Sequence, residues 1–579
     1  MPKWQVGRGT GMNRRLMGNN HQANSGSRDL DMGQLQGPRS LRDLTSSVAK
    51  RAGIPPDETI PRKLDRQRVK HSQKKPLRIM KFGGTSVGDV SSIEKVVEII
   101  RDAASESNVV VVVSAMSGVT NQLIEAATQA ESGNRKSVAM IFEELRKRHE
   151  AAIGALVHSA AERSRIAQTI GAILQEGDQV CQGTILLREL TLRTCDAISS
   201  LGERLSAPLL AAALADCGMA SEAIEATELL VTDSYHGGAE PRMTLTRERS
   251  EARLRPLLEQ GIVPVVTGFI GATEEGVLTT LGRGGSDYSA TILGAALDAD
   301  EVIIWTDVDG VLTADPRQVP DVSAIPEISY REAAELAQFG ARVLHPKTLR
   351  PLMQSDIPLW IRNTFSPERP GTKITPSGCL HVRGVKALSA ISDVALITVG
   401  GPGIVGMRDV LGRTFTTTAA VRADVLLISQ SSSQNDICFV VPAAVAGRTV
   451  EALRREFAQD LEHETVEHIT LDPTIAIVAV VGEKMRGIPG IVGRTFGALG
   501  RENVSIIAIA QGSSECNISV VVARKDMKAA LLAAHTEFQL GALPSQTFPV
   551  KTAPATAGKA KSGAPRWQVT APGLAQSTD

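Results

Sequence analysis

The sequence predicts an α/β protein: a largely parallel β-sheet sandwiched by helices, followed by two small α+β modules. Short apolar runs alternate with segments of helical periodicity between residues 76 and 375, which is typical of repeated βα units. These runs are continuously apolar, which favours strands buried on both faces. Motifs within residues 385–545 occur twice, which indicates a duplicated module. The chain has 579 residues, 42% of them hydrophobic, and is long enough for several domains.

The expected elements of the first part follow one another along the chain. LRIMKFGG (77–84) reads as an apolar strand that runs into glycines, and SSIEKVVEIIRDAAS (91–105) places its apolar residues on one helical face. NVVVVVSAMSG (108–118) is a β-branched run typical of a buried parallel strand. Residues 121–195 are mostly helical, and the strand pattern returns in GIVPVVTGFIG and EVIIWTDVDG. Ligands of such sheets bind beyond the carboxyl ends of the strands.

The second part contains an internal repeat. GRTF at 412–415 recurs at 493–496, and LISQSSSQNDICFVV (427–441) recurs as AIAQGSSECNISVVV (508–522). Each copy reads as a strand, a glycine-rich turn, a helix, a strand and a Gln-Ser-Ser turn into another strand. We expect the two modules to pack against each other through equivalent surfaces; duplication for stability alone is the alternative. A formal G-x-G-x-x-G match lies inside this repeat, and the second copy breaks its spacing, so it is not taken as a dinucleotide site.

Composition argues against several classes of function. The formal net charge is zero, so no overall field favours nucleic acid or a membrane surface. Apolar runs all fall short of the roughly 20 residues that span a bilayer. The six cysteines are dispersed without a C-x-x-C pair, and the ten histidines show no H-x-x-x-H spacing. The sequence therefore predicts no metal ion held by a protein cluster.

Both ends of the chain differ in composition from the rest. Residues 1–75 are polar and rich in arginine, and they predict a disordered basic extension of a cytoplasmic protein. An organelle transit peptide is the alternative, and it would imply a plastid location. Residues 551–579 are of low complexity and predict a flexible tail.

KFGGTSVGD (81–89) predicts a phosphate cradle. A lysine at the end of a strand precedes two glycines and two hydroxyl residues that are expected to open a helix: Lys81, Gly83, Gly84, Thr85 and Ser86. Glycines let backbone N–H groups approach a phosphate, and the lysine supplies positive charge to a transferring phosphoryl group. An ordinary glycine turn with an exposed lysine is the alternative.

Two further motifs combine charge with a helix start. In TTLGRGGSDYSA (279–290), Arg283 and Asp287 flank glycines that open a helical run, where N–H groups and the helix dipole favour anions. An arginine fork suits a substrate carboxylate, and Asp287 could hold Lys81 or organise Mg²⁺ if the fold brings them together. LGERLSAPLL (201–210) places Glu203 at another helix start, where the alternative is a carboxylate favoured only by the dipole.

Phosphate chemistry of the P-loop type is not indicated, because the chain has no G-x-x-x-x-G-K-[ST] motif. TDVDGVLTADPR (306–317) instead follows a buried strand as a polar loop with Asp-Gly and Asp-Pro turns. Its position after the strand favours nucleotide contact.

Six motifs occur in an order that resembles the aspartate kinases of the amino-acid kinase family: KFGGTSVGD, SAMSGVTN, LGERLSA, TTLGRGGSDYSA, WTDVDGVLTADPR and FGARVLHPKTL. The resemblance covers residues 77–545 and includes paired regulatory ACT modules. It implies the amino-acid kinase fold for residues 76–375 and the ACT pair for residues 385–545. The chain looks most like the kinase half of bifunctional aspartate kinase–homoserine dehydrogenases. Too few residues follow for a dehydrogenase domain, so a monofunctional kinase is expected.

The resemblance implies phosphorylation of the L-aspartate side-chain carboxylate by ATP with Mg²⁺, the first step toward lysine, threonine and methionine. Lys81 and Asp287 would be catalytic, with Lys81 on the ATP phosphates. Residues implied for aspartate binding are Thr120, Glu203, Arg283, Gly284, Gly285 and Ser286, with Arg283 on the α-carboxylate and Glu203 on the α-amino group. Residues implied for the nucleotide are Gly83, Gly84, Thr85, Ser86, Thr306, Asp307, Leu312, Arg317 and Arg342.

Two positions depart from the family pattern. Leu312 stands where a tyrosine is common, and Arg342 replaces the usual lysine of the FGAKVLHP-like motif. Because arginine and lysine differ in geometry, these departures bear on ATP affinity more than on the reaction.

The Gln-Ser-Ser turns resemble threonine-binding turns of bifunctional relatives, which nominates Gln430 and Gln511 as allosteric residues. Threonine is the expected inhibitor and lysine the runner-up. ACT pairs commonly pack between chains, so a homodimer or larger homo-oligomer is expected. The competing hypotheses are an amino-acid sensor without catalysis and a kinase of glutamate or N-acetylglutamate.

Overall fold

The structure is a computed structural model that describes residues 75–542 except 341–343, 379–383, 402–407, 431–434, 486–487 and 512–515. The C-terminal tail expected from the sequence, and the N-terminal extension up to residue 74, lie outside the described residues. The described part belongs to one compact unit, Lys74–Asp579. Within it, no helix combines the length and apolar character needed to cross a membrane.

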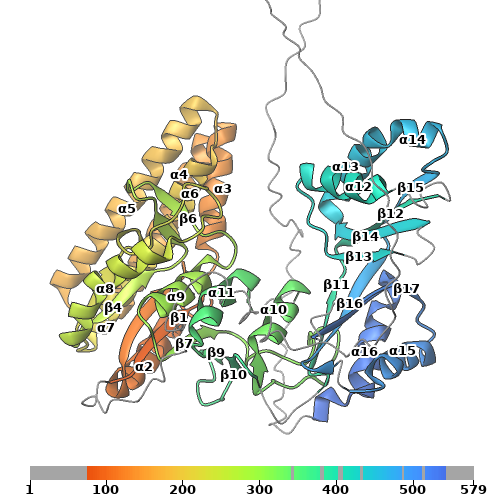
Figure 1. Ribbon diagram of the computed structural model, residues 1–579. Helices are drawn as coiled ribbons and strands as arrows, with labels where there is room; N and C mark the ends of the chain where they lie inside the picture. Colours follow the sequence, from red (N-terminus) through yellow and green to blue (C-terminus); the bar gives the residue numbers. More distant parts are fainter. Residues whose placement is uncertain are drawn as a thin grey trace, which may run out of the picture. The chain divides into compact units, whose positions relative to one another are not determined.

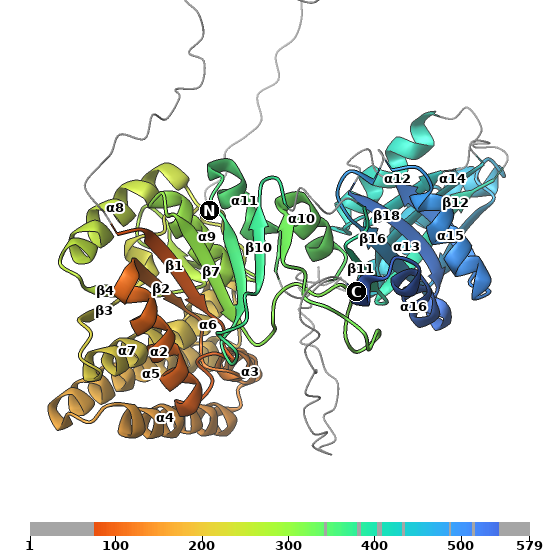
Figure 2. The ribbon, with the colours of Figure 1, turned by 90° about the horizontal axis from the view of Figure 1, so that it is seen from below.

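An eight-stranded sheet forms the core of the first domain (Figures 1 and 2). Its strand order is β3-β4-β2-β1-β7-β9-β10-β8. The strands are β1 (Leu77–Phe82), β2 (Asn108–Val113), β3 (Ser221–Ile224), β4 (Val263–Thr267), β7 (Glu301–Thr306), β8 (Glu327–Ser329), β9 (Leu359–Asn363) and β10 (Thr372–Thr375). Neighbours from β3 to β9 are parallel, whereas β10 runs antiparallel to β9 and parallel to β8. The predicted, largely parallel sheet is confirmed.

The valines of β2 explain why this sheet is covered on both faces. Val110 and Val112 contribute to one buried cluster, and Val109, Val111 and Val113 contribute to a second. Successive side chains of a strand point to opposite faces, so a continuous valine run feeds two cores at once. Both cores need helices to exclude water, which the intervening helical segments supply.

The helices come from the segments with helical periodicity. They are α2 (Val90–Glu106), α3 (Val119–Ser132), α4 (Arg135–Leu156), α5 (Ala160–Leu187), α6 (Leu192–Ser199), α7 (Leu201–Asp216), α8 (Met243–Glu259), α9 (Gly285–Ala296), α10 (Tyr330–Gln338) and α11 (Pro346–Ser355). A short hairpin of β5 (Ile270–Ala272) and β6 (Leu278–Thr280) precedes α9, and residues Ala226–Glu228 form a 3₁₀ turn. The predicted helical stretch 121–195 is confirmed by α3 to α6.

One helix start differs from the sequence expectation. Thr85 and Ser86 lie in a turn, and α2 begins only at Val90. Asp89 is the N-cap, and its side chain accepts the backbone N–H of Ser92 at 2.8 Å. A capping carboxylate satisfies an N–H group that the first helical turn leaves free, which fixes the start there. The prediction that Thr85 and Ser86 open the helix is therefore wrong.

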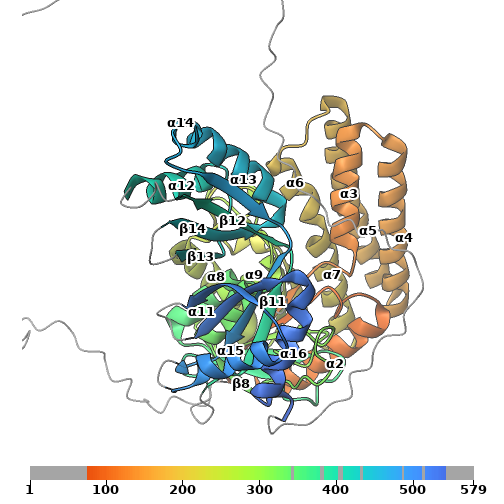
Figure 3. The same cartoon turned by 90° about the vertical axis from the view of Figure 1, so that its right-hand side faces the viewer.

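The repeat folds into two similar α+β modules, each with a four-stranded sheet (Figure 3). The first sheet has the order β13-β14-β12-β15, and the second β11-β16-β18-β17. The first module consists of β12 (Val394–Gly400), α12 (Arg408–Ala420), β13 (Leu427–Gln430), β14 (Asp436–Pro442), α13 (Ala443–Glu456), α14 (Ala458–Glu462) and β15 (His468–Asp472). The second consists of β16 (Ile475–Val481), α15 (Ile491–Arg501), β17 (Ile506–Gln511), β18 (Asn517–Ala523) and α16 (Met527–Glu537), with 3₁₀ turns at Arg524–Asp526 and Leu540–Ala542.

Strand β11 (Ala387–Ile391) connects the first domain to the second module. It precedes the first module in sequence but pairs antiparallel with β16 of the second. It also contacts the first domain, because Leu388 donates its N–H to the carbonyl of Thr313 at 2.7 Å. Next to it, Lys386 forms a buried ion pair with Glu332 of α10, with 2.8 Å between Nζ and Oε2.

Candidate active site

Lys81 and Asp287 meet at the carboxyl edge of the parallel sheet. Lys81 lies in β1, between Val112 of β2 and Ile304 of β7. Asp287 belongs to the first turn of α9, and the lysine Nζ lies 2.5 Å from its Oδ1. Lys81 is 7% exposed, so its charge sits in a poorly solvated place where electrostatic interactions are strong. The structure thus brings together the two residues that the resemblance nominates as catalytic.

Of the two glycines after β1, Gly84 allows a close approach to the loop after β2. A Cβ on Gly84 would lie 3.0 Å from the carbonyl oxygen of Ala115, in the loop after β2. A Cβ on Gly83 would lie 3.6 Å from the Lys81 ammonium nitrogen. A side chain on Gly84 would therefore press against the loop after β2, whereas the position of Gly83 has room for a Cβ.

The two hydroxyl residues of this turn differ in their surroundings. Thr85 is exposed, whereas Ser86 is fully buried. The Ser86 hydroxyl lies 2.7 Å from Thr364 Oγ1 and donates to the carbonyl of Trp305 at 3.4 Å. Its side chain therefore anchors the turn to the neighbouring strands, and a role in nucleotide binding would rest on its backbone.

Glu203 lies in the first turn of α7 and is 4% exposed. Ser286 donates its hydroxyl to Oε1 at 3.4 Å, while Oε2 is buried without a hydrogen-bond partner among the described residues. Burial raises the pKa of Glu203 to about 7, against the opposing effect of N–H donors from Ala115 and Glu203 itself, the Ser286 hydroxyl and the Lys81 charge. A buried carboxylate oxygen without a donor fits a ligand that brings one.

Thr120 lies beside the helix start that carries Glu203. It occupies the first turn of α3, and a Cβ on Gly202 would lie 3.6 Å from its hydroxyl oxygen. The same Cβ would come within 2.6 Å of the Ala115 side chain, so Gly202 permits close packing of the start of α7 against the loop after β2. Three polar side chains named from the resemblance, Thr120, Glu203 and Ser286, therefore belong to one neighbourhood.

Arg283 lies in the turn that opens α9. Gly284 is the N-cap with φ +70°, a conformation that favours glycine, and a Cβ there would lie 2.9 Å from His345 Cβ. Arg283 is exposed, and no hydrogen bond or ion pair joins it to another residue in the described ranges. Burial lowers the pKa of His345, with further effects of the Lys347 and Arg283 charges. The guanidinium thus remains available to an incoming anion.

The residues proposed for nucleotide binding are only partly assembled around Lys81. Thr306 ends β7, adjacent to β1, and its hydroxyl donates to the exposed Asp307 at 3.3 Å. Leu312 forms an isolated bridge with Ala324, and Arg317 pairs with Asp315 at 2.6 Å. No hydrogen bond or ion pair joins Leu312 or Arg317 to Lys81 or Asp287 in the part of the chain that is described. Arg342 lies outside the described residues.

The two candidate allosteric residues occupy equivalent positions. Gln430 ends β13 and Gln511 ends β17, and both are exposed. The Gln-Ser-Ser turns that follow them, 431–434 and 512–515, lie outside the described residues. β13 and β17 contact each other, so the equivalent strands of the two modules are neighbours.

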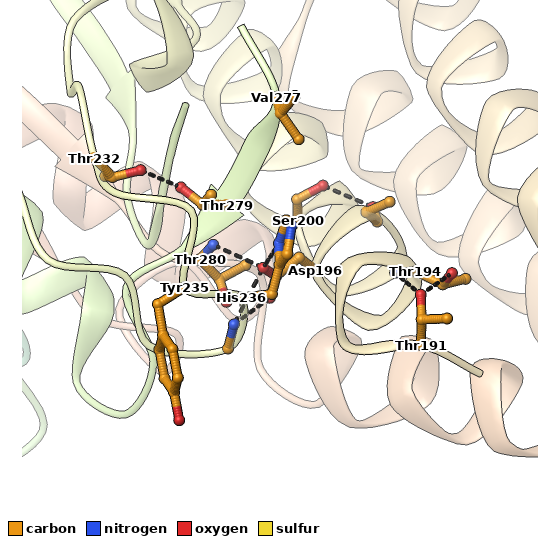
Figure 4. Close-up of polar contacts among 12 residues, drawn as sticks. Thr191, Thr194, Asp196, Ser200, Thr232, Tyr235, His236, Val277, Thr279 and Thr280 are labelled. Atoms are coloured by element: carbon orange, nitrogen blue, oxygen red, sulfur yellow. Dashed lines mark hydrogen bonds and ion pairs between the residues drawn. The ribbon is translucent and has the colours of Figure 1, made fainter. Parts of the chain in front are cut away.

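Sequence reasoning missed a polar cluster centred on Asp196 (Figure 4). Asp196 lies in α6, is 2% exposed, and contacts His236, Gly237 and Thr280. Thr280 lies in the TTLGRGGSDYSA motif, whereas His236 and Gly237 belong to no motif recognised in the sequence. The only local signal was a carboxylate within a helix of otherwise unremarkable pattern.

Comparison with known proteins agrees with this architecture. The amino acid kinase family profile matches residues 76–363, and the ACT domain profile matches residues 397–457 and 478–538. The chain is 36% identical over 470 residues to a chloroplastic bifunctional aspartokinase/homoserine dehydrogenase 1 of Arabidopsis thaliana, covering 80% of this chain and 51% of that protein. It is 32% identical to Aspartokinase 1, chloroplastic, of the same plant, covering 79% and 80%.

Solved structures give the same result. The fold matches E. coli aspartokinase III in complex with aspartate and ADP with a TM-score of 0.68 and 29% identity, over 80% of this chain and all of that one. The chain spans about half the length of the bifunctional relatives that it matches. An amino acid kinase domain followed by two ACT domains, together with these relatives, shows that the chain belongs to the aspartokinase family.

Proposed function

We propose that the protein is an aspartate kinase that transfers the γ-phosphoryl group of ATP to the side-chain carboxylate of L-aspartate. The products are 4-phospho-L-aspartate and ADP, and the reaction is the first step of lysine, threonine and methionine biosynthesis. The observation that carries the proposal is a pair of groups of opposite charge: the buried Glu203 Oε2, which has no hydrogen-bond partner among the described residues, and the exposed guanidinium of Arg283. An amino acid offers an ammonium donor to the first and a carboxylate to the second.

The substrate would be held by its α-groups. Its ammonium group binds Glu203, its α-carboxylate binds Arg283 and the Gly284 N–H, and Ser286 and Thr120 supply hydroxyl groups. Gly285, also nominated for this site, shapes the turn instead, because its N–H donates to the Gly282 carbonyl at 2.9 Å. E. coli aspartokinase III, a structural relative, has been solved with aspartate and ADP. Because the two α-groups are held in this way, the side-chain carboxylate of aspartate is left free to face the phosphate.

The chemistry requires positioning and charge neutralisation. A carboxylate oxygen of aspartate attacks the γ-phosphorus, the bond to the bridging oxygen breaks, and ADP leaves with the electron pair. The attacking carboxylate is already ionised at neutral pH, so no proton has to be removed and no covalent enzyme intermediate is needed. Lys81 neutralises charge on the transferring group, while Asp287 holds the lysine in place.

Mg²⁺ would enter with the nucleotide. It usually takes one or two carboxylates together with substrate phosphates, and it neutralises charge on the β- and γ-phosphates. Asp287 is the carboxylate beside Lys81, and Thr306 and Asp307, at the end of the strand next to β1, are candidates for nucleotide contact.

Regulation by an amino acid at the ACT pair is part of the proposal. Threonine is the first candidate and lysine the second, with Gln430 and Gln511 as contacts. The neighbouring equivalent strands β13 and β17 support a shared site, and E. coli aspartokinase III has been solved with lysine in a T-state. The ACT pair would also join chains into a homodimer or larger oligomer.

The chloroplastic names of plant relatives support the plastid alternative to a cytoplasmic location.

An assay of ADP release tests the function. Aspartate, glutamate and N-acetylglutamate are offered separately as acceptors, each with and without threonine, lysine or methionine. Aspartate should support turnover at least about a hundredfold better than the other two, because the acceptor carboxylate must sit in line with ATP. Equal turnover with glutamate would contradict the proposed substrate. Binding of an amino acid without any ADP release would favour the sensor hypothesis.

A further inference from the structure

Asp196 is a buried carboxylate that accepts hydrogen bonds from two segments distant in sequence. His236 Nδ1 lies 2.7 Å from Oδ2, and the Gly237 N–H lies 3.1 Å from both oxygens. Thr280 contributes its hydroxyl at 2.5 Å and its N–H at 3.3 Å. Because an ionised carboxylate only accepts, His236 Nδ1 carries the hydrogen. Figure 4 shows His236 and Thr280 beside Asp196.

The cluster lies between the two halves of the proposed aspartate site. Asp196 on α6 and Glu203 on α7 lie on two helices that follow each other almost without a break. Ser200 donates its N–H to the Asp196 carbonyl at 3.0 Å, and α7 begins at the residue after Ser200. Thr280 ends β6 and is separated from Arg283 by only two residues. Asp196 therefore joins the element that carries Glu203 to the loop that carries Arg283.

The segment 236–240 packs against the loop after β6, which carries Arg283. A Cβ on Gly282 would lie 2.9 Å from the Gly237 carbonyl oxygen, and Ala239 donates its N–H to the Thr280 carbonyl at 2.9 Å. At its far end, Glu240 accepts the Tyr288 hydroxyl of α9 at 3.1 Å and pairs with Lys347 of α11 at 2.8 Å. The segment is thus fixed at both ends around the start of α9.

None of these groups takes part in the proposed transfer. A buried carboxylate is costly unless its oxygens are satisfied, so all the donors have to be in place together. The hydrogen bonds therefore make the cluster rigid. They hold the loop after β6 at a fixed position relative to α7. Recognition of an amino acid by Glu203 and Arg283 depends on that separation.

We propose that Asp196, together with His236 and Thr280, is a positioning residue that sets the separation between Glu203 and Arg283 and thereby the affinity for the amino-acid substrate. The inference rests on the proposed function for its substrate. The positioning itself is a property of the fold and is tested separately.

A pair of neighbouring threonines offers a matched test. Thr280 and Thr279 are consecutive residues of β6 and both are buried, but the Thr279 hydroxyl contacts Thr232 at 2.7 Å instead of Asp196. Thr280→Val should raise the KM for aspartate about tenfold, because a hydrogen bond to a charged group is lost. The KM for ATP should change less than about twofold. Thr279→Val should leave both constants unchanged, and Thr280→Ser should restore the wild-type value.

Hydrogen–deuterium exchange gives a readout that is independent of turnover. Backbone amides of residues 281–290 should exchange faster in Thr280→Val and in Asp196→Asn than in Thr279→Val, with the melting temperatures of the two valine variants alike. Unchanged exchange, or an equal rise of the KM for aspartate in both valine variants, overturns the inference. Faster exchange in a protein that shows no turnover of aspartate supports the positioning role and overturns the proposed function alone.

Discussion

Lys81 and Asp287 form an ion pair with 2.5 Å between Nζ and Oδ1, although one residue lies in the first strand and the other in α9. The pair ties the first turn of α9 to the central strand of the sheet. Ser286, next to Asp287, contacts Glu203 on α7. One short stretch of α9 therefore connects the proposed phosphoryl-transfer centre with the proposed aspartate site.

Lys81→Met should lower kcat by about three orders of magnitude, because the transferring phosphoryl group loses its charge partner in a poorly solvated site. The KM for aspartate should rise by a smaller factor than kcat falls, although loss of the Lys81 charge also raises the pKa of Glu203. Steady-state ADP release measures both constants. Lys147→Met is the matched control, because that ammonium forms an exposed pair with Glu143. Near-normal turnover in Lys81→Met would remove the lysine from the mechanism.

The raised pKa of Glu203 predicts a pH dependence of substrate capture. Only the ionised form binds an ammonium group, so kcat/KM for aspartate should fall about tenfold per pH unit below about pH 7. At saturating aspartate, kcat should depend less on pH, because the bound ammonium favours the carboxylate. Glu203→Gln should have a low kcat/KM without this inflection. A wild-type profile that stays flat between pH 5 and pH 8 would refute the role.

Glu203 should also affect stability with a defined sign. Its pKa is higher in the folded than in the unfolded protein, so the folded state binds more protons between about pH 4.5 and pH 7. The free energy of unfolding should therefore fall as the pH rises through this window and then level off. Glu203→Gln removes this effect and should be the more stable protein at pH 8, by on the order of 1–3 kcal/mol. Urea unfolding at pH 5 and pH 8 compares the two.

Arg283→Lys should raise the KM for aspartate at least about tenfold while leaving the KM for ATP within about twofold. Lysine keeps the charge but loses the fork that holds a carboxylate by two parallel hydrogen bonds. Arg135→Lys is the control, since that guanidinium is exposed and donates to the neutral side chain of Gln182. Equal effects on the two KM values would show that Arg283 does not discriminate between the substrates.

The sheet could be predicted from the sequence because its signal is local. The valine run of β2 and the glycine-opened helix α9 occur where the pattern placed them. Strand β11 could not be placed, because ALSAI is compatible with any sheet and nothing local says that it pairs with β16. The short strands β8 and β10 offer too few residues for a periodic pattern.

Site residues could be predicted where a short motif combines charged residues with glycines. They could not be predicted where the contacts join residues that are far apart in sequence. Lys81, Glu203 and Asp287 stand out beside glycines and helix starts. The partners of Asp196 lie 40 and 84 residues away in sequence, so only the fold reveals the cluster. Ser86 was assigned to the nucleotide from its motif, but only the fold shows that its hydroxyl contacts Thr364, 278 residues away.

Threonine at about 100 times its dissociation constant should stabilise the protein by roughly 2.7 kcal/mol, and it should inhibit ADP release. Binding inhibits only if the amino acid prefers an inactive arrangement, so both effects are required. Gln430→Ala and Gln511→Ala should weaken both, without changing kcat in the absence of threonine. Lysine is tested in parallel. If neither amino acid changes stability or activity, the ACT pair has another ligand.

Lys386→Met should destabilise the protein by about 3–5 kcal/mol, because it leaves the Glu332 charge buried without its partner. Glu332 Oε2 also accepts the Ser329 N–H at the start of α10, so the double variant Lys386→Met, Glu332→Gln keeps an acceptor there and should recover part of the loss. Lys525→Met, at an exposed position, is the control.

Because the Lys386–Glu332 pair joins α10 to the segment that enters β11, calorimetry of Lys386→Met should separate the unfolding of the kinase domain from that of the second ACT module. A single transition of unchanged midpoint would show that the hydrogen bonds of β11 to Thr313 and Phe339 suffice to couple them.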